Sequence, residues 1–314
     1  MAQLIKLQDY ISRYETDLSR YPTQFVRLKK QQWEKMKNAW EMGVVPESKD
    51  TFEKESIEQG FLDKVRGWFN KKDVEDLQEI EEAEIHHQND EQMDFSLSLQ
   101  AADTEMELKQ QFLDQLLRFQ MKWASSTIAE KSFVDSMYYS DERLYHFIQR
   151  FPDTFLLFYE PIFLLKKAPV ELEVLLLTPT EIWCLAFLES EENAAYIGST
   201  DHFWLKRSND QDSKVLNPAL SAGRMEKIVN QLFRLYEVEL PIRKAIISRN
   251  GYIDYPEVPG ELLLLDKRTY QEWFHKVRGS SSPLKMMQLR AAKALLDYCQ
   301  TSSYRRTEWN PENE

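Results

Sequence analysis

The chain has 314 residues, of which 42% are hydrophobic, including 17 Phe, 14 Tyr and 8 Trp, so it can fill one sizeable core with extensions or two small ones. Its two cysteines exclude a disulfide framework and a four-thiolate zinc site and favour a reducing compartment, so we expect a cytoplasmic protein. No segment approaches the roughly 18 apolar residues of a membrane span, and the net charge of −12 opposes non-specific binding to phosphates.

Residues 1–44 are expected to form a helical N-terminal extension. Apolar residues at three- and four-residue spacing predict a helix over 4–18 that ends before Pro22, and a second helix follows with Phe25, Met36 and Trp40 on its apolar side. The other side of the second helix is basic and is either a surface for nucleic acid or an acidic partner, or a solvated face opposite a docked stripe. Its basic residues are Arg27, Lys29, Lys30, Lys35 and Lys37.

Residues 45–101 are acidic and poor in apolar side chains. Between residues 45 and 95 there are 16 acidic and 6 basic residues, which predicts a flexible linker. A short amphipathic helix is expected at 59–72, either as a docking site for an unknown protein partner or a membrane surface, or folded back on the main domain. Its apolar face consists of Phe61, Leu62, Val65, Trp68 and Phe69.

Residues 102–139 are expected to be helical. Thr104 and Glu107 fit a capping box that opens a helix running to about Trp123, and a further helical stretch is expected over 128–137. Ser140 is the expected N-cap of the next helix, over 141–150, which Pro152 stops.

After Pro152 the hydrophobic period changes to that of strands. The pattern predicts strands at 154–160, 162–166, 171–178, 182–189, 194–197, 202–206, 242–248 and 262–265. Helices are expected at 218–236 and 268–277, followed by a C-terminal helix at 283–298 and a polar tail within 279–314. This alternation indicates an α/β or α+β fold.

Short motifs within residues 140–278 occur in an ordered series. A helix bears Glu142, a strand begins after Glu173, a Pro-containing turn follows, and a hairpin with Gly198 and Trp204 precedes an Asn-Pro pair at a helix start. The series and its spacing resemble the nuclease-related domain (NERD) family of the restriction-endonuclease-like fold. The resemblance covers under half of the chain and implies a central mixed sheet with flanking helices, with helical N- and C-terminal extensions around it.

The resemblance also implies a site chemistry. Family members hold a divalent cation, usually Mg²⁺, between two strand carboxylates, and a Lys two residues after the second acid stabilises charge on the phosphate. Here the vestigial-site candidates are Glu142 and Glu173, but the Glu-x-Lys positions fall on Ala186 and Leu188. Glu189 is the nearest substitute acid, and strand alternation directs it to the opposite face from Ala186.

We therefore expect a non-catalytic scaffold or binding protein derived from a nuclease fold, with no cofactor. Glu142 and Glu173 are then ordinary charges at a helix start and a strand entry. Two alternatives stay open. One is a metal-dependent DNA nuclease with an altered site, which would use Mg²⁺ held by Glu173 and Glu189. The other is a nucleic-acid-binding protein that does not cut and relies on the basic N-terminal helix.

Overall fold

The computed structural model describes residues 1–43, 102–166, 168–209, 211–280 and 282–306. The chain divides into two compact units, one formed by Met1–Gln31 and Leu113–Glu314 and the other by Gln32–Phe112. The predicted linker at 45–101, its short helix at 59–72 and the end of the polar tail lie outside the described residues.

The first unit is built on a mixed sheet in which six described strands follow the order β1-β3-β6-β7-β11-β13. β3, β6 and β7 are antiparallel neighbours, while β11 runs parallel to β7 and β13 runs parallel to β11. The strands are β1 (Gln3–Leu7), β3 (Leu156–Tyr159), β6 (Val174–Leu177), β7 (Ile182–Phe187), β11 (Ile242–Ile247) and β13 (Leu262–Leu265). The expected α/β class with a central mixed sheet and flanking helices is confirmed.

The predicted helix over 4–18 is wrong. Residues Gln3–Leu7 form β1, which pairs in parallel with β3, and Arg13–Glu15 form a short 3-10 helix, η1. All five residues of β1 are buried, so the strand lacks the polar alternation that marks a half-exposed strand. Leu4 and Leu7, three residues apart, then mimic a helical stripe. The N-terminal segment is thus part of the core sheet.

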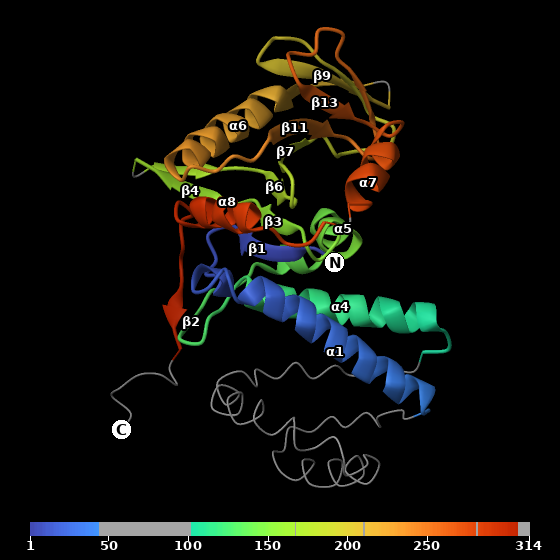
Figure 1. Cartoon of the computed structure of the whole chain (residues 1–314). Helices are drawn as coiled ribbons and strands as arrows, with labels where there is room; N and C mark the ends of the chain where they lie inside the picture. Colours follow the sequence, from blue (N-terminus) through green and yellow to red (C-terminus); the bar gives the residue numbers. More distant parts are fainter. Residues whose placement is uncertain (44–101, 167, 210, 281, 307–314) are drawn as a thin grey trace, which may run out of the picture. The chain divides into compact units, whose positions relative to one another are not determined.

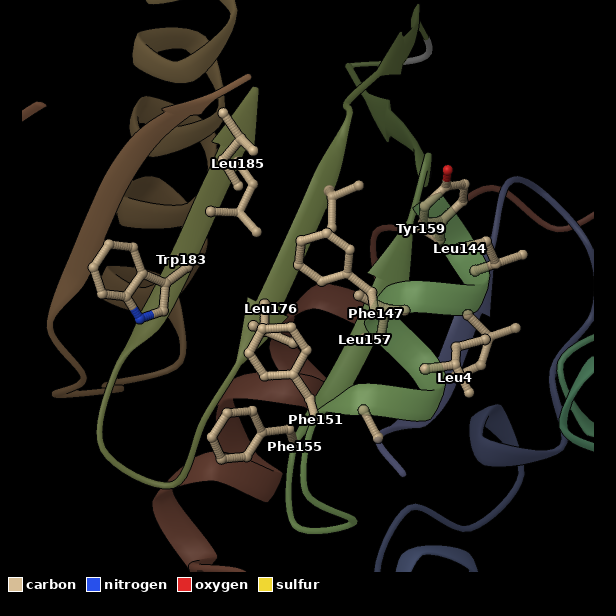
Figure 2. Packing of buried hydrophobic residues seen from close by; sticks show 14 of the residues in the cluster. Leu4, Leu144, Phe147, Phe151, Phe155, Leu157, Tyr159, Leu176, Trp183 and Leu185 are labelled. Atoms are coloured by element: carbon tan, nitrogen blue, oxygen red, sulfur yellow. The ribbon is translucent and has the colours of Figure 1, made fainter. Parts of the chain in front are cut away.

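Helices cover both faces of the sheet (Figure 1). α5 (Glu142–Arg150) and α7 (Tyr270–Arg278) contribute to one cluster of buried apolar residues with the strands. Figure 2 shows Phe147 of α5 and Phe151, the residue that ends this helix, in the cluster with Leu157 of β3, Leu176 of β6 and Leu185 of β7. α6 (Pro218–Leu235) packs along β7 and β11 on the other side and contacts α8 (Met286–Leu296).

A second, smaller sheet has the order β10-β9-β8-β12. Its strands are β8 (Ala195–Ile197), β9 (Phe203–Ser208), β10 (Gln211–Leu216) and β12 (Tyr252–Asp254), of which β10 and β12 were not predicted. The predicted hairpin around Gly198 is present as β8 and β9. Gly198 is required there, because an added Cβ would lie 2.7 Å from Cγ of Tyr255.

The segment after α4 (Glu105–Trp123) differs from the prediction. No helix forms over residues 128–137, which contain the short strand β2 (Glu130–Lys131) and the start of the 3-10 helix η2 (Ser136–Tyr139). β2 pairs with β14 (Tyr304–Arg305) near the end of the described chain. Two further strands, β4 (Ile162–Leu165) and β5 (Ala168–Glu171), form a hairpin, of which only β4 was predicted. Asp141, rather than Ser140, caps α5.

The second unit contains the end of α1 (Tyr21–Glu41) and the start of α4 within its described residues. Trp33 and Phe112 meet edge to face with ring centroids 5.3 Å apart, and the indole of Trp40 donates to the carbonyl of Ala102. Both predicted helices are therefore present. In the part of the chain that the structure describes, no helix is long and apolar enough to cross a membrane.

Candidate functional site

The residues singled out by the sequence lie near one edge of the central sheet. β3 and β7 end there and β6 begins there, because β6 is antiparallel to both. β11 is parallel to β7, so Ile247 ends at the same edge as Phe187. Glu173 directly precedes β6. Val174 pairs with Leu185 in antiparallel register, so extending this register by one residue sets Glu173 opposite Ala186.

The carboxylate of Glu173 is held by two protein donors. One oxygen accepts a hydrogen bond from the backbone N–H of Phe187 at 2.8 Å, and the other accepts one from the hydroxyl of Ser221 at 2.6 Å. Ser221 belongs to α6, so the carboxylate is on the α6 side of the sheet. Burial raises the pKa of Glu173, an effect opposed by these hydrogen bonds and by Arg143 and Arg224.

The two positions expected for Glu-x-Lys supply no polar side chain. Ala186 is fully buried and Leu188 is 7% exposed. A methyl group and an isobutyl group cannot coordinate a cation or donate to a phosphate. The edge therefore keeps one carboxylate, Glu173, on the α6 side.

Glu189 lies on the opposite side of the sheet. Its carboxylate receives Nε and Nη2 of Arg249, with Nη2 at 2.7 Å, so the pair is bidentate. Both side chains are largely buried. Arg249 and Glu189 both act electrostatically on Tyr270 of α7, which faces the α5 and α7 side. Glu173 and Glu189 are thus separated by the sheet and are not brought together as metal ligands.

A second guanidinium lies close to this edge. Arg143 of α5 donates to the hydroxyl of Tyr159 at 2.7 Å and to Glu160 at 2.8 Å, and its guanidinium carbon lies 4.6 Å from the ring centroid of Phe187. Glu160 also accepts from the hydroxyl of Tyr138 at 2.8 Å. Arg143 is therefore fixed between an aromatic surface and a carboxylate.

Glu142 precedes this arginine and its side chain is exposed at the first turn of α5. An acid in the first turn of a helix is favoured by the helix dipole. Among the described residues, no group of three or more His, Cys, Asp or Glu side chains is arranged to hold a metal ion.

One histidine is close to the cluster of charged side chains. Nε2 of His146 lies 2.8 Å from the hydroxyl of Tyr270, and burial, with Arg249 and Arg150, lowers the pKa of His146 to about 4. The imidazole is therefore neutral at physiological pH. Cys184 is fully buried, and burial raises the pKa of its thiol well above the usual range, which disfavours a nucleophilic thiolate.

Sequence reasoning missed the two arginines, Arg143 and Arg249. The ends of parallel strands meet at one edge of a sheet, so the parallel pairing of β7 and β11 could have brought Glu189 and Arg249 together. The sequence indicated less clearly that Arg143 belongs to the site. Arg143 is next to the candidate Glu142, but adjacent residues of a helix point in different directions.

No protein-family model matches the chain, and no solved structure gives a significant match. The chain is similar to an RNA 2',3'-cyclic phosphodiesterase from Geobacillus stearothermophilus, with 40% identity over 125 residues. The matched part is 38% of this chain and 36% of that relative, so the chain spans about a third of the relative's length.

Proposed function

We propose that this chain is a non-catalytic binding or scaffold protein built on a NERD-like core. The observation that carries the proposal is the pairing of charges at the sheet edge. Arg143 and Arg249 neutralise Glu160 and Glu189, where a metal-dependent nuclease needs carboxylates free for a cation. Glu160 and Glu189 thus already have cationic partners. Glu173, held by two neutral donors, has no second acid at Ala186 or Leu188 to share a cation, so a divalent ion gains little by binding there.

The order of the elements supports the NERD-like part of the proposal. Glu142 is on α5, Glu173 precedes β6, the Pro179 turn joins β6 to β7, and the β8–β9 hairpin precedes α6. Asn217 caps α6, with its side-chain oxygen accepting from the amide of Ala219 at 2.9 Å. This order of elements along the chain is the support for a NERD-like core.

Plasmid cleavage tests the proposal. Purified full-length protein is incubated with supercoiled plasmid and Mg²⁺ or Mn²⁺, beside the variant Glu173→Ala and the control Glu34→Ala, an exposed acid of α1 outside the candidate site. We expect no nicking by any of the three. Nicking by the native protein and the control, but not by Glu173→Ala, would establish a live metal site and refute the scaffold proposal.

The name of the Geobacillus relative favours a second candidate, hydrolysis of RNA 2',3'-cyclic phosphates. Such a reaction can proceed by general acid–base catalysis, and His146 with Tyr270 is the pair that could transfer a proton near two arginines. The test is turnover of 2',3'-cyclic AMP without metal. Turnover that His146→Gln abolishes, while the exposed control Glu34→Ala retains it, would replace the first candidate.

The basic residues of α1 bear on whether the chain binds nucleic acid. Lys29 pairs with Asp153 and Lys37 lies 3.7 Å from both Glu41 and Glu105, so two of the five basic residues of α1 already have acidic partners. Arg27, Lys30 and Lys35 are exposed. This pattern favours a solvated face over a nucleic-acid surface. The free cysteines Cys184 and Cys299 accord with a cytoplasmic location.

A further inference from the structure

A cavity of about 790 Å³ lies at the other end of the strands that form the candidate site. Trp183 and Arg243, near the starts of β7 and β11, line it, whereas Glu189 and Arg249 follow the ends of the same strands. β13, α7 and the turn between β6 and β7 also contribute to the lining. Its volume is within the range of about 300–1,000 Å³ that small-ligand sites occupy.

Two indole rings form the aromatic part of the cavity. The ring centroids of Trp183 and Trp273 are 5.3 Å apart and their planes cross at 80°. Figure 2 shows Trp183 at the border of the apolar cluster on β7. Leu263 of β13 adds an aliphatic surface and is 42% exposed, although it lies in the sheet. Such surfaces favour a flat apolar body.

The polar groups around these rings include both donors and acceptors. Glu181 accepts from the indole N–H of Trp183 at 2.9 Å and from Nε of Arg243 at 3.4 Å, and Arg243 also donates to Glu261 at 3.2 Å. Glu181 and Arg243 therefore hold each other in place. Nε1 of Trp273 is buried and has no acceptor among the described residues.

The charges around the cavity disfavour an anionic ligand. Glu181, Glu261 and Glu272 line it, against Arg243 and Lys276, and Arg243 is already bound to two of the acids. A phosphate would approach more carboxylates than free cations, and like charges at close range are strongly unfavourable.

We infer that this cavity binds an uncharged planar heteroaromatic molecule of nucleoside size. A nucleobase can lie flat against the exposed Leu263 and meet the rims of the two indoles, which are only 5% (Trp183) and 7% (Trp273) exposed, and its edge carries both donors and acceptors, as the lining does. The ribose hydroxyls can pair with carboxylates and with the Thr180 hydroxyl, which also lines the cavity. Because the acidic lining disfavours a phosphate group, the matching class of ligand is a nucleoside and not a nucleotide. This inference does not depend on the proposed scaffold role.

Isothermal titration calorimetry tests the inference on the full-length protein, with adenosine, guanosine, cytidine and uridine as probes. We expect saturable binding of at least one nucleoside below about 1 mM, the weak end of specific affinities. The matching 5'-triphosphate should bind at least about tenfold more weakly, because the acids repel it. Leu263→Trp should abolish binding by filling the cavity while leaving the circular dichroism spectrum unchanged, since Leu263 is partly exposed on an edge strand.

Thr180→Trp fills the cavity from an exposed position in the β6–β7 turn and replaces Leu263→Trp if that variant does not fold. The control Glu34→Ala, at an exposed position of α1 that does not line the cavity, should bind like the native protein. The inference is overturned if no nucleoside gives saturable heat, if binding survives the filled cavity, or if the triphosphate binds as tightly as the nucleoside.

Discussion

Glu173 is either a structural acid or a metal ligand, and its substitution by Gln or Ala distinguishes the two roles. In the structure its carboxylate only accepts hydrogen bonds, from the Phe187 amide and the Ser221 hydroxyl. Gln keeps the shape, and its amide can accept from Phe187 while donating to Ser221. Ala removes both acceptors and leaves two donors unsatisfied beside the sheet.

The expected magnitudes follow from these contacts. Glu173→Ala should lower the free energy of unfolding by about 1–3 kcal/mol, the cost of leaving buried donors without partners. Glu173→Gln should be as stable as the native protein or more so at pH 7, because burial raises the pKa of Glu173 and penalises the charged form.

The sign of the pH dependence follows from the raised pKa. A group whose pKa is higher in the folded state binds its proton more tightly there, so its stabilising contribution is complete below the ordinary value of 4.5. That contribution is lost as pH rises through the folded pKa. The native protein and Glu173→Gln should therefore be equally stable at low pH, and the variant should gain relative to the native protein toward pH 7.

Urea unfolding followed by circular dichroism, at several pH values and with or without Mg²⁺, measures the stability of both variants, its pH dependence and any stabilisation by the cation. A cation bound to the native state at 100 times its Kd would add about 2.7 kcal/mol to the native protein. We expect no such increase. A Mg²⁺-dependent gain that Glu173→Gln eliminates, or a variant that loses stability as pH rises, would refute the structural role of Glu173.

Three further variants test other contacts by urea unfolding. Arg249→Met should cost about 1–3 kcal/mol by leaving Glu189 without its guanidinium, and adding Glu189→Gln should restore part of the loss; no restoration would contradict the pairing. Gly198→Ala should cost about 1–3 kcal/mol through overpacking against Tyr255, so an unchanged midpoint would refute the close approach. Asn217→Ala should cost about 0.5–2 kcal/mol by removing the cap of α6, and a neutral result would argue against that cap.

Much of the fold was readable because local signals agreed with the tertiary structure. Asn217 before Pro218 predicted the start of α6, and the run at 262–265 predicted β13 with its bounds. β10 was missed because most of its residues are exposed and polar, so no alternating pattern marks them. Strands β5 and β12 have only four and three residues, too few for a repeating pattern, and only pairing with their neighbours defines them.

The site was readable only in part. The strand register sets Glu173 opposite Ala186, as the motif order implied. The arginines could not be assigned from spacing, because Arg143 and Glu160 are far apart in sequence and meet only when α5 packs on β3. A local pattern reports neighbours along the chain, whereas an ion pair between elements depends on how those elements pack.

The buried ion pair between Lys6 and Glu15 leads to an asymmetric prediction. Nζ of Lys6, which is fully buried in β1, lies 2.5 Å from Glu15 and 2.9 Å from the hydroxyl of Thr301. Glu15 also accepts from the Ser12 amide at 3.2 Å and from Thr301 at 3.0 Å. Lys6→Met therefore leaves Glu15 with two donors and fills the same space with apolar atoms.

Glu15→Ala instead leaves a buried ammonium with only the neutral Thr301 hydroxyl. Removing one partner of a buried pair typically costs about 3–5 kcal/mol, whereas a well-packed apolar replacement is often neutral. We therefore expect Glu15→Ala to lower the free energy of unfolding by about 3 kcal/mol or more, and Lys6→Met to lower it by clearly less. Urea unfolding of both variants at pH 7 measures the difference. Equal losses, or a larger loss for Lys6→Met, would contradict this reasoning. The ammonium of Lys6 would then itself stabilise the packing of β1, whereas we expect its burial to be unfavourable without Glu15.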